Sequence, residues 1–224
     1  MPLLPQDLRF AVRSLRRGRI ASLFAILSLA LGIAGNAVTF SLIEPLLFKP
    51  LPYPEPDRLV ILGEREKDAP DLAILSLVSS LPAFADFRER SATLVDWSAM
   101  SPSYYAVSQG DRSVSVFAAL VTPGFFRTLG AQAVRGRLFE DSEAVEGGPK
   151  VAVVTQEYWE RALGSERDPL GIVLTLDGEP HQVVGVLQEG FEFIVPGVDI
   201  WVPLQLDPYA YPRTRRMVVS LARM

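Results

Sequence analysis

The chain has 224 residues and a formal net charge of −4. The charge is uneven, because five arginines against Asp7 give the first 19 residues +4 and leave −8 for the remainder. A basic start on an acidic body argues against nucleic-acid binding and suits a short segment held at an anionic membrane surface. The sequence contains no cysteine, which excludes structural disulfides, thiolate catalysis and cysteine-ligated zinc.

Residues 1–19 are predicted to be a basic cytoplasmic segment with helical periodicity. Leu8, Val12 and Leu15 fall on one face of that helix. The arginines that we assign to membrane topology and to contact with anionic lipid are Arg9, Arg13, Arg16, Arg17 and Arg19. The pattern fits an amphipathic helix in the cytoplasmic interface, and a bare topology signal explains it equally well.

Residues 20–43 are predicted to be a transmembrane helix, because these 24 positions carry no charge. Such a helix is roughly 36 Å long, which exceeds the hydrocarbon core of about 30 Å. Positive charge on the N-terminal side places the N-terminus in the cytoplasm. The alternative is a signal peptide cleaved near Gly35-Asn36-Ala37, but the apolar run is longer than such peptides use. Under either interpretation the rest of the chain is exported from the cytoplasm.

Ser28, Gly32 and Asn36 recur every four residues within this predicted span. Small residues at that spacing allow helices to approach closely in lipid, and an amide buried there needs a hydrogen-bonding partner. We therefore interpret the stripe as a surface for packing against other membrane helices. The alternative is that small residues are simply common in such helices.

A proline-rich stalk is predicted over residues 44–57, where five prolines lie among residues 45–56 and should hold the chain extended. Residues 58–224 are predicted to form one extracytoplasmic domain. The fold class is thus α+β: one N-terminal transmembrane helix, then a mixed α+β domain of short strands and few helices. Strands are expected at 58–64, 94–100, 104–109, 113–120, 150–154, 172–176, 182–187, 198–203 and 217–222, and helices at 82–90, 122–129 and 156–163.

Residues typical of turns and helix ends support three of these element boundaries. Gly110-Asp111 separates two expected strands and indicates a hairpin. Thr122 is expected to cap a short helix, with Pro123 at its first position and Gly130 at its end.

Residues that carry chemistry do not gather into a recognisable set, so we predict no catalytic, cofactor or metal site and no enzyme activity. His181 is the only histidine and is expected at an ordinary surface or turn position. The acidic residues Glu140, Asp141, Glu143 and Glu146 are interpreted as a solvated loop, with calcium binding as the alternative. The scattered aromatic residues are expected to pack the core, and a hydrophobic ligand groove is the alternative.

Six stretches in order resemble the periplasmic core domain of MacB-type permeases. They are TPGFFRTLG with GRLF at 122–139, VAVVTQEYW at 151–159, DPLG at 168–171, LTLDG at 174–178, VVGV with GF at 183–191, and DIWVPL at 199–204. The apolar N-terminal segment and KPLPYPEPDRL at 49–59 fit the same pattern. The arginine-rich start is most similar to large bacterial permeases of the MacB/FtsX type.

This resemblance implies a permease subunit of an ABC transporter in the bacterial inner membrane. Such subunits form dimers and couple to a cytoplasmic ATPase that is a separate chain, either to export a substrate or to transmit force across the membrane. The resemblance also implies three further helices after the periplasmic domain, so we expect this sequence, ending at Met224, to be either a fragment of a longer permease or a truncated reading frame. The alternative is a membrane-anchored periplasmic binding or adaptor domain without transport, and an anchored hydrolase is a weaker third.

Overall fold

The computed structural model describes residues 19–47, 53–64, 77–109, 112–164, 168–193, 195–205 and 207–224. The chain separates into two compact units, residues 1–51 and residues 52–224.

The described part of the first unit is a long helix, α2, which spans Arg19–Leu47. It therefore includes the first four residues of the predicted stalk. Large apolar side chains along it are more than half exposed: Ile20, Leu23, Phe24, Leu27, Leu29, Leu31, Ile33 and Phe40. Within the part of the chain that the structure describes, no helical stretch is both long enough and apolar enough to cross a membrane. The transmembrane assignment of residues 20–43 stays a prediction.

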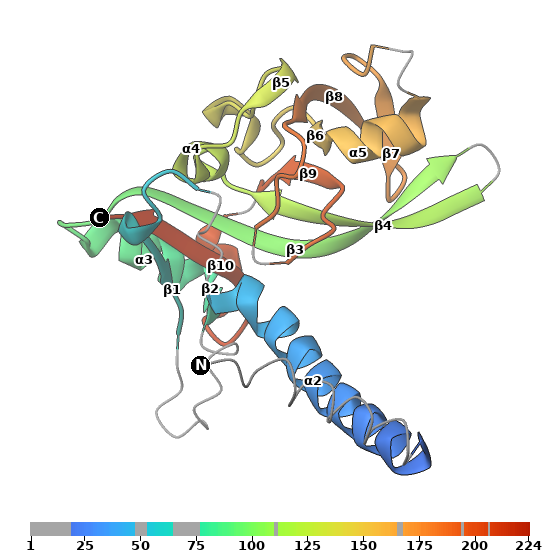
Figure 1. The fold of residues 1–224 in the computed structure, drawn as a ribbon. Coiled ribbons are helices and arrows are strands. Elements are labelled where there is room, and N and C mark those ends of the chain that lie inside the picture. Colours follow the sequence, from blue (N-terminus) through green and yellow to red (C-terminus); the bar gives the residue numbers. More distant parts are fainter. Residues whose placement is uncertain are drawn as a thin grey trace. The chain divides into compact units, whose positions relative to one another are not determined.

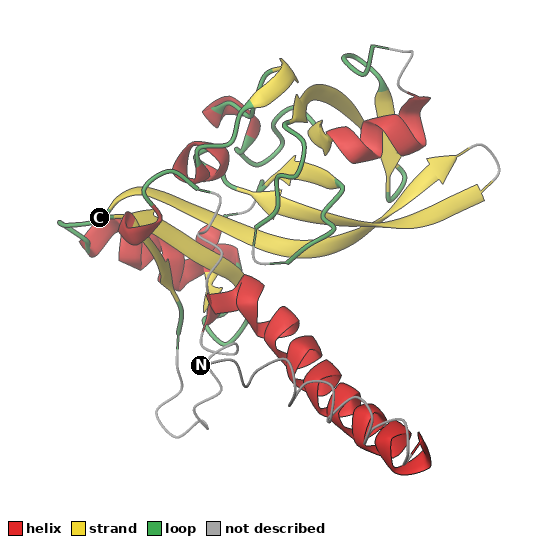
Figure 2. Cartoon of the chain, viewed as in Figure 1, coloured by secondary structure: helices red, strands yellow, loops and turns green. Residues whose placement is uncertain are grey.

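The second unit is built on one mixed sheet with the strand order β1-β10-β3-β4-β9-β6-β8-β5, while β2 pairs with β10 and β7 pairs with β3 and β8. Figures 1 and 2 show the long β3–β4 hairpin running through this unit, with α3 beside one end and α5 beside the other. The mixed α+β class predicted for this domain is confirmed. The strands are β1 Leu59–Leu62, β2 Ser79–Ser80, β3 Val95–Gln109, β4 Arg112–Val121, β5 Ala133–Gly136, β6 Val151–Thr155, β7 Val173–Leu176, β8 Glu179–Leu187, β9 Ile200–Pro203 and β10 Arg216–Arg223.

Short helices connect the strands. The α-helices are α3 Leu81–Arg90, α4 Phe125–Leu129 and α5 Gln156–Tyr158. A π-helical turn, Trp159–Gly164, continues α5 and completes the helix predicted at 156–163. The 3₁₀ turns are η1 Pro56–Arg58, η3 Asp141–Glu143 and η5 Pro208–Ala210.

The two strands predicted at 94–100 and 104–109 are one continuous strand, β3. Its antiparallel register with β4 runs from Met100 opposite Val121 to Gln109 opposite Arg112, which confirms the hairpin, although Gly110 and Asp111 lie outside the described residues. Pro102 does not break the strand. The described pairing of β3 with β10 ends at Met100, so the N–H that Pro102 lacks is not needed on that side.

Helix α4 begins later than the sequence indicates. Thr122 does not cap it, because the Thr122 hydroxyl accepts the backbone N–H of Ala99 instead, at 2.9 Å. Gly124 occupies the N-cap position and the helix starts at Phe125. The predicted end is correct, since Gly130 adopts φ +67° and terminates the helix in the left-handed conformation.

The core lies on both faces of the sheet and is rich in aromatic rings. Trp201 is fully buried on β9 and its ring lies 5.5–5.6 Å from the rings of Phe125, Phe126 and Phe191. Such tilted and edge-to-face contacts add to the burial of large apolar area. Most of the aromatic residues therefore pack the core as predicted, whereas Tyr104 is 69% exposed on β3.

Candidate functional site

The segment that leads into the second unit, Tyr53–Arg58, is bound to the body of the domain, and we call this segment the neck. The Tyr53 hydroxyl donates a hydrogen bond to the backbone carbonyl of Glu192 at 2.6 Å, and the Tyr53 ring lies 5.9 Å from the Phe193 ring. Burial, and then the nearby Glu192 carboxylate, raise the pKa of Tyr53 to about 12. The phenol therefore keeps its proton and its hydrogen bond throughout the neutral range.

Arg223, at the end of β10, joins the neck to helix α4. Its Nε donates to the carbonyl of Thr128 at 2.8 Å, and its Nη2 donates to the carbonyl of Pro54 at 2.7 Å. A third, longer hydrogen bond of 3.4 Å reaches the carbonyl of Glu55. A guanidinium presents donors in a fixed planar fork, so one side chain sets the positions of two backbone segments.

The neck also closes onto the last residue of the chain. Arg58 Nε donates to the carbonyl of Met224 at 2.6 Å, and the Met224 N–H donates to the Arg58 carbonyl at 2.9 Å. Arg58 is held in place by Glu55, whose carboxylate lies 2.8 Å from Nη1. We call the contacts of Tyr53, Arg58 and Arg223 with the domain the neck clamp.

The described part of the stalk is therefore bent rather than extended. Glu55 adopts φ 46° and ψ 60°, and a 3₁₀ turn follows at once. Pro54 packs so closely on Gly130 that a β-carbon added to Gly130 would lie 2.4 Å from Pro54 Cγ. Glycine at position 130 thus serves two needs, a left-handed backbone and room for the neck.

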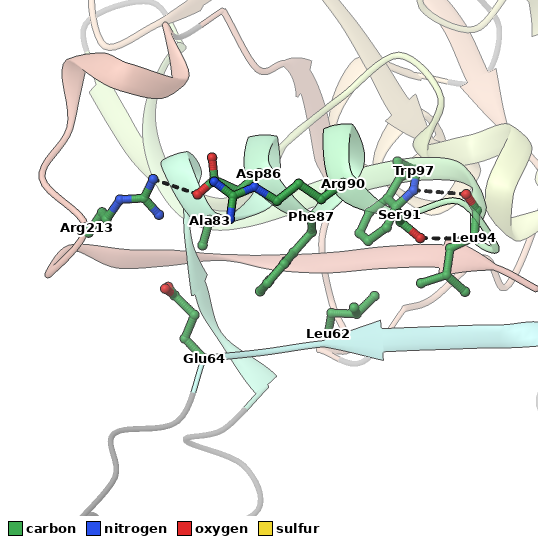
Figure 3. Close-up of a pocket in the computed structure, with 10 residues that line it drawn as sticks. All are labelled: Leu62, Glu64, Ala83, Asp86, Phe87, Arg90, Ser91, Leu94, Trp97 and Arg213. Atoms are coloured by element: carbon green, nitrogen blue, oxygen red, sulfur yellow. Dashed lines mark hydrogen bonds and ion pairs between the residues drawn. The ribbon is translucent and has the colours of Figure 1, made fainter.

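A groove of about 410 Å³ opens between α3 and the end of β1. Figure 3 shows Phe87 extending from α3 toward Leu62, and Arg213 reaching Asp86 at one end. The rings of Phe87 and Trp97 stack at 6.4 Å with an interplanar angle of 27°. The groove thus offers an aromatic surface beside charged groups.

The polar groups that line this groove are mostly engaged in internal contacts. The Glu64 carboxylate accepts the Ser80 N–H at 2.6 Å, and Trp97 Nε1 donates to the Leu94 carbonyl at 3.2 Å. Arg213 Nη2 lies 2.6 Å from Asp86 Oδ2. These groups are arranged to hold the walls of the groove, and the accessible aromatic surface is suited to binding.

The predicted helix-packing residues lie on α2. Ser28, Gly32 and Asn36 are all exposed, and the Asn36 amide donates to the Gly32 carbonyl of its own helix at 3.1 Å. Arg19 is the first residue of α2. The other predicted topology residues, Arg9, Arg13, Arg16 and Arg17, lie outside the described residues.

Two titratable residues are more buried than the sequence predicts. His181 is 8% exposed within β8 rather than at the surface. Glu143 belongs to the acidic loop but is 3% exposed, and its carboxylate lies 2.6 Å from Arg137 Nη2. Burial acts to raise the pKa of Glu143, but hydrogen bonds from Arg137 and from the Glu140 N–H outweigh it and leave the pKa below its ordinary value.

The neck clamp is not predicted by the sequence pattern. Tyr53 and Arg58 belong to the conspicuous PYPEPDRL run, and Arg223 belongs to the last predicted strand. Nothing in the local pattern links them, because the contacts join residues 95 to 169 positions apart. The repeated prolines were the available signal, since they mark a fixed backbone path.

Comparison with protein families matches residues 22–223 to the model of the MacB-like periplasmic core domain. Similar folds occur in the periplasmic region of MacB from Actinobacillus actinomycetemcomitans, with TM-score 0.55, 14% identity, and coverage of 74% of this chain and 73% of that one. The extracellular domain of the noncanonic ABC-type transporter YknZ from Gram-positive bacteria gives TM-score 0.52, 16% identity, and coverage of 74% and 81%. A domain of a candidate permease from Porphyromonas gingivalis gives TM-score 0.55, 14% identity, and coverage of 77% of both chains. No curated protein sequence matches this chain.

Proposed function

Because the chain belongs to the family of MacB-like periplasmic core domains, we propose that it is part of an ABC-transporter permease subunit driven by a separate cytoplasmic ATPase. In this proposal residues 20–43 span the inner membrane, residues 1–19 stay at its cytoplasmic surface, and the body lies outside the cytoplasm. Two copies, or this chain and a partner permease, pack through the stripe of Ser28, Gly32 and Asn36. The work done is export or the transmission of force.

The neck clamp is the observation that carries the mechanical part of this proposal. The neck is bound to α4 and β10 through Arg223, and to the loop after β8 through Tyr53. A displacement of the neck therefore moves the domain as one body instead of being absorbed by a loose linker. Charged hydrogen bonds onto backbone carbonyls suit this role, because they fix position and direction together.

The exposed apolar side chains of α2 support the membrane part of the proposal. Leu31 is 79% exposed and Phe24 is 67% exposed. Soluble proteins rarely leave a contiguous apolar surface of this kind uncovered. In this proposal lipid and neighbouring membrane helices cover the apolar side chains of α2.

ATPase coupling tests the function directly. The permease, expressed from its complete reading frame and reconstituted in lipid, is mixed with its ATPase, and ATP hydrolysis is measured with and without the permease. We expect the two proteins to co-purify and the permease to change the hydrolysis rate. A permease that is recovered alone and leaves the rate unchanged would refute the proposal.

The clamp is tested in the same assay. Arg223→Met removes the bonds to Pro54 and Thr128, whereas Arg216→Met alters an exposed arginine at the opposite end of β10. We expect Arg223→Met to reduce the permease effect on hydrolysis while co-purification persists, and Arg216→Met to behave as wild type. Equal behaviour of the two variants would overturn the role of the clamp but leave the family role standing.

The absence of cysteine allows a clean test of topology. Single cysteines are introduced at Ser14 and at Ser108, which is exposed on β3, and intact spheroplasts are treated with a membrane-impermeant maleimide. We expect labelling at position 108 alone, with position 14 labelled only after lysis. Labelling of both positions in intact cells, or of position 14 alone, contradicts the proposed orientation.

A second candidate is a membrane-anchored binding or adaptor domain without transport, and the open groove beside α3 favours it. An adaptor would engage its ligand whether or not the ATPase is turning over. Ligand binding that is unaffected by ATP, in a complex where hydrolysis is also unaffected by the permease, would favour the adaptor.

A further inference from the structure

The chain's single histidine lines a cavity of about 260 Å³ on the β6–β8–β9 side of the domain. Its polar walls are Tyr105, Lys150, Glu179, His181 and Gln205. Its apolar walls are Leu120, Val202 and Pro203. Residues from five separate stretches of the chain thus converge on one small space.

The hydrogen bond of His181 fixes which ring nitrogen is free. Nδ1 lies 3.0 Å from the backbone carbonyl of Glu179. A carbonyl can only accept, so Nδ1 carries the proton and Nε2 of the neutral ring is a bare acceptor. Among the described residues no hydrogen-bond partner contacts Nε2, and Nε2 is not one of the fully enclosed side-chain atoms that lack a partner. This nitrogen is therefore open to the cavity and available to a partner from outside the chain.

Tyr105 and Lys150 supply donors to the same cavity. Burial, followed by the charges of Asp177 and Glu179, raises the pKa of Tyr105, so its phenol remains a donor. The Tyr105 hydroxyl has no hydrogen-bonding partner among the described residues. The Lys150 ammonium lies 2.5 Å from the Glu179 carboxylate, which occupies only one of its three donors.

Gln205 keeps this arrangement in place. Its amide nitrogen donates to the carbonyl of Glu143 at 2.6 Å and to the carbonyl of Pro149 at 3.0 Å. Pro149 is the residue immediately before Lys150 in the chain. The wall that carries Lys150 is therefore tied to the strand that carries Val202.

We propose that this cavity binds a small hydroxycarboxylate. The ligand hydroxyl donates to His181 Nε2, the ligand carboxylate accepts from Lys150 and Tyr105, and a compact apolar group rests on Leu120 and Val202. The volume of about 260 Å³ is slightly below the usual range of ligand sites and admits about ten non-hydrogen atoms.

The single histidine makes a direct test possible. The full chain, labelled with ¹⁵N at histidine and purified without a histidine tag, gives one set of ring signals. It is titrated with mandelate, with phenylacetate, which lacks the hydroxyl, and with mandelamide, which lacks the negative charge. We expect mandelate to shift the His181 ring signals saturably, phenylacetate to bind about fivefold more weakly, and mandelamide about tenfold more weakly.

Two neighbouring tyrosines provide a matched pair of variants. Tyr105→Phe removes the donor in the cavity, whereas Tyr104→Phe changes the exposed residue beside it on the opposite face of β3. We expect Tyr105→Phe to weaken mandelate binding about fivefold and Tyr104→Phe to leave it unchanged. Lys150→Met, at a side chain that is 40% exposed, gives a second variant that should fold normally and bind at least about tenfold more weakly.

Three results would overturn the proposal. The first is an unchanged His181 spectrum at the solubility limit of mandelate. The second is equal affinity for the three compounds, which would indicate adventitious apolar binding. The third is an equal loss of affinity in Tyr104→Phe and Tyr105→Phe. None of these results bears on ATPase coupling, so the two proposals can fail separately.

Discussion

At its C-terminal end β10 is bonded to the neck and to α4 by Arg223. The loop before its N-terminal end meets α3 through the ion pair Arg213–Asp86 and through Tyr211, which packs on the apolar cluster that includes Phe84. The Arg223 bonds end on backbone carbonyls that are fixed in the fold. The Arg213 bond ends on a side chain at the rim of an open groove, and the Arg213 side chain is 58% exposed. The polar contacts at the two ends of the strand therefore differ, and we call the Arg213 end, with its exposed ion pair, the adjustable end.

The largest effect is expected from cutting the fixed end. Arg223→Met leaves the carbonyls of Pro54 and Thr128 without their charged donor, which should lower the free energy of unfolding by about 2 kcal/mol. Arg216→Met, at the other end of the strand, should change it by less than about 0.5 kcal/mol. Denaturant unfolding of the full chain in mild detergent, followed by tryptophan fluorescence, measures both. Equal losses in the two variants would mean that the ends of β10 do not differ.

The packing of the neck on α4 is tested by adding one methyl group. Gly130→Ala meets two penalties, a left-handed backbone and a clash with Pro54, and should destabilise the domain by about 2–3 kcal/mol. Gly147→Ala is the control, because Gly147 has φ +73° and no atom within 4 Å of an added β-carbon. It should cost about 1 kcal/mol. If the two variants lose the same stability, the neck does not press on Gly130.

The position of the neck should also respond to alkaline pH through Tyr53. Its pKa is raised from 10.0 to about 12 in the folded protein. The stability contribution is therefore present below pH 10 and is lost as the pH rises through 12. Tyr53→Phe should remove this alkaline dependence and cost about 1 kcal/mol at neutral pH for the lost hydrogen bond.

Unfolding measured across the alkaline range tests this expectation. Tyr209→Phe is the control, because Tyr209 is 59% exposed and its variant should keep the wild-type pH profile. A profile that is unchanged by Tyr53→Phe would show that the phenol does not hold the neck.

Much of the fold follows from local sequence pattern. The predicted strands and the helix at 82–90 appear close to their predicted places, because alternation and caps act over a few residues. The short strands β2 and β5 were not predicted. Gly130 ends α4 as predicted, since only glycine adopts its backbone conformation without strain.

Departures arise where a distant residue takes over a local role. Thr122 resembles a helix cap in sequence, but the N–H of Ala99 on the neighbouring strand uses its hydroxyl. Glu143 is part of an acidic loop, yet Arg137 and the 3₁₀ turn draw it into the interior. His181 is buried because residues of other strands, Tyr105 of β3 among them, pack over its face of β8. Such packing partners cannot be predicted from the sequence of a single strand. The neck clamp is invisible for the same reason.

The smallest effect is expected at the adjustable end of β10. Asp86→Asn breaks the ion pair with Arg213. Because the Arg213 side chain is exposed, the pair should contribute about 0.5 kcal/mol or less to the free energy of unfolding. Added salt screens such a pair, so the difference between wild type and Asp86→Asn should shrink further as ionic strength rises. Unfolding at low and high salt measures this directly. The expectation is wrong if Asp86→Asn loses as much free energy of unfolding as Arg223→Met and the loss persists at high salt. The groove rim would then be held as firmly as the neck, and α3 and the loop at Arg213 would move with the domain instead of around a ligand.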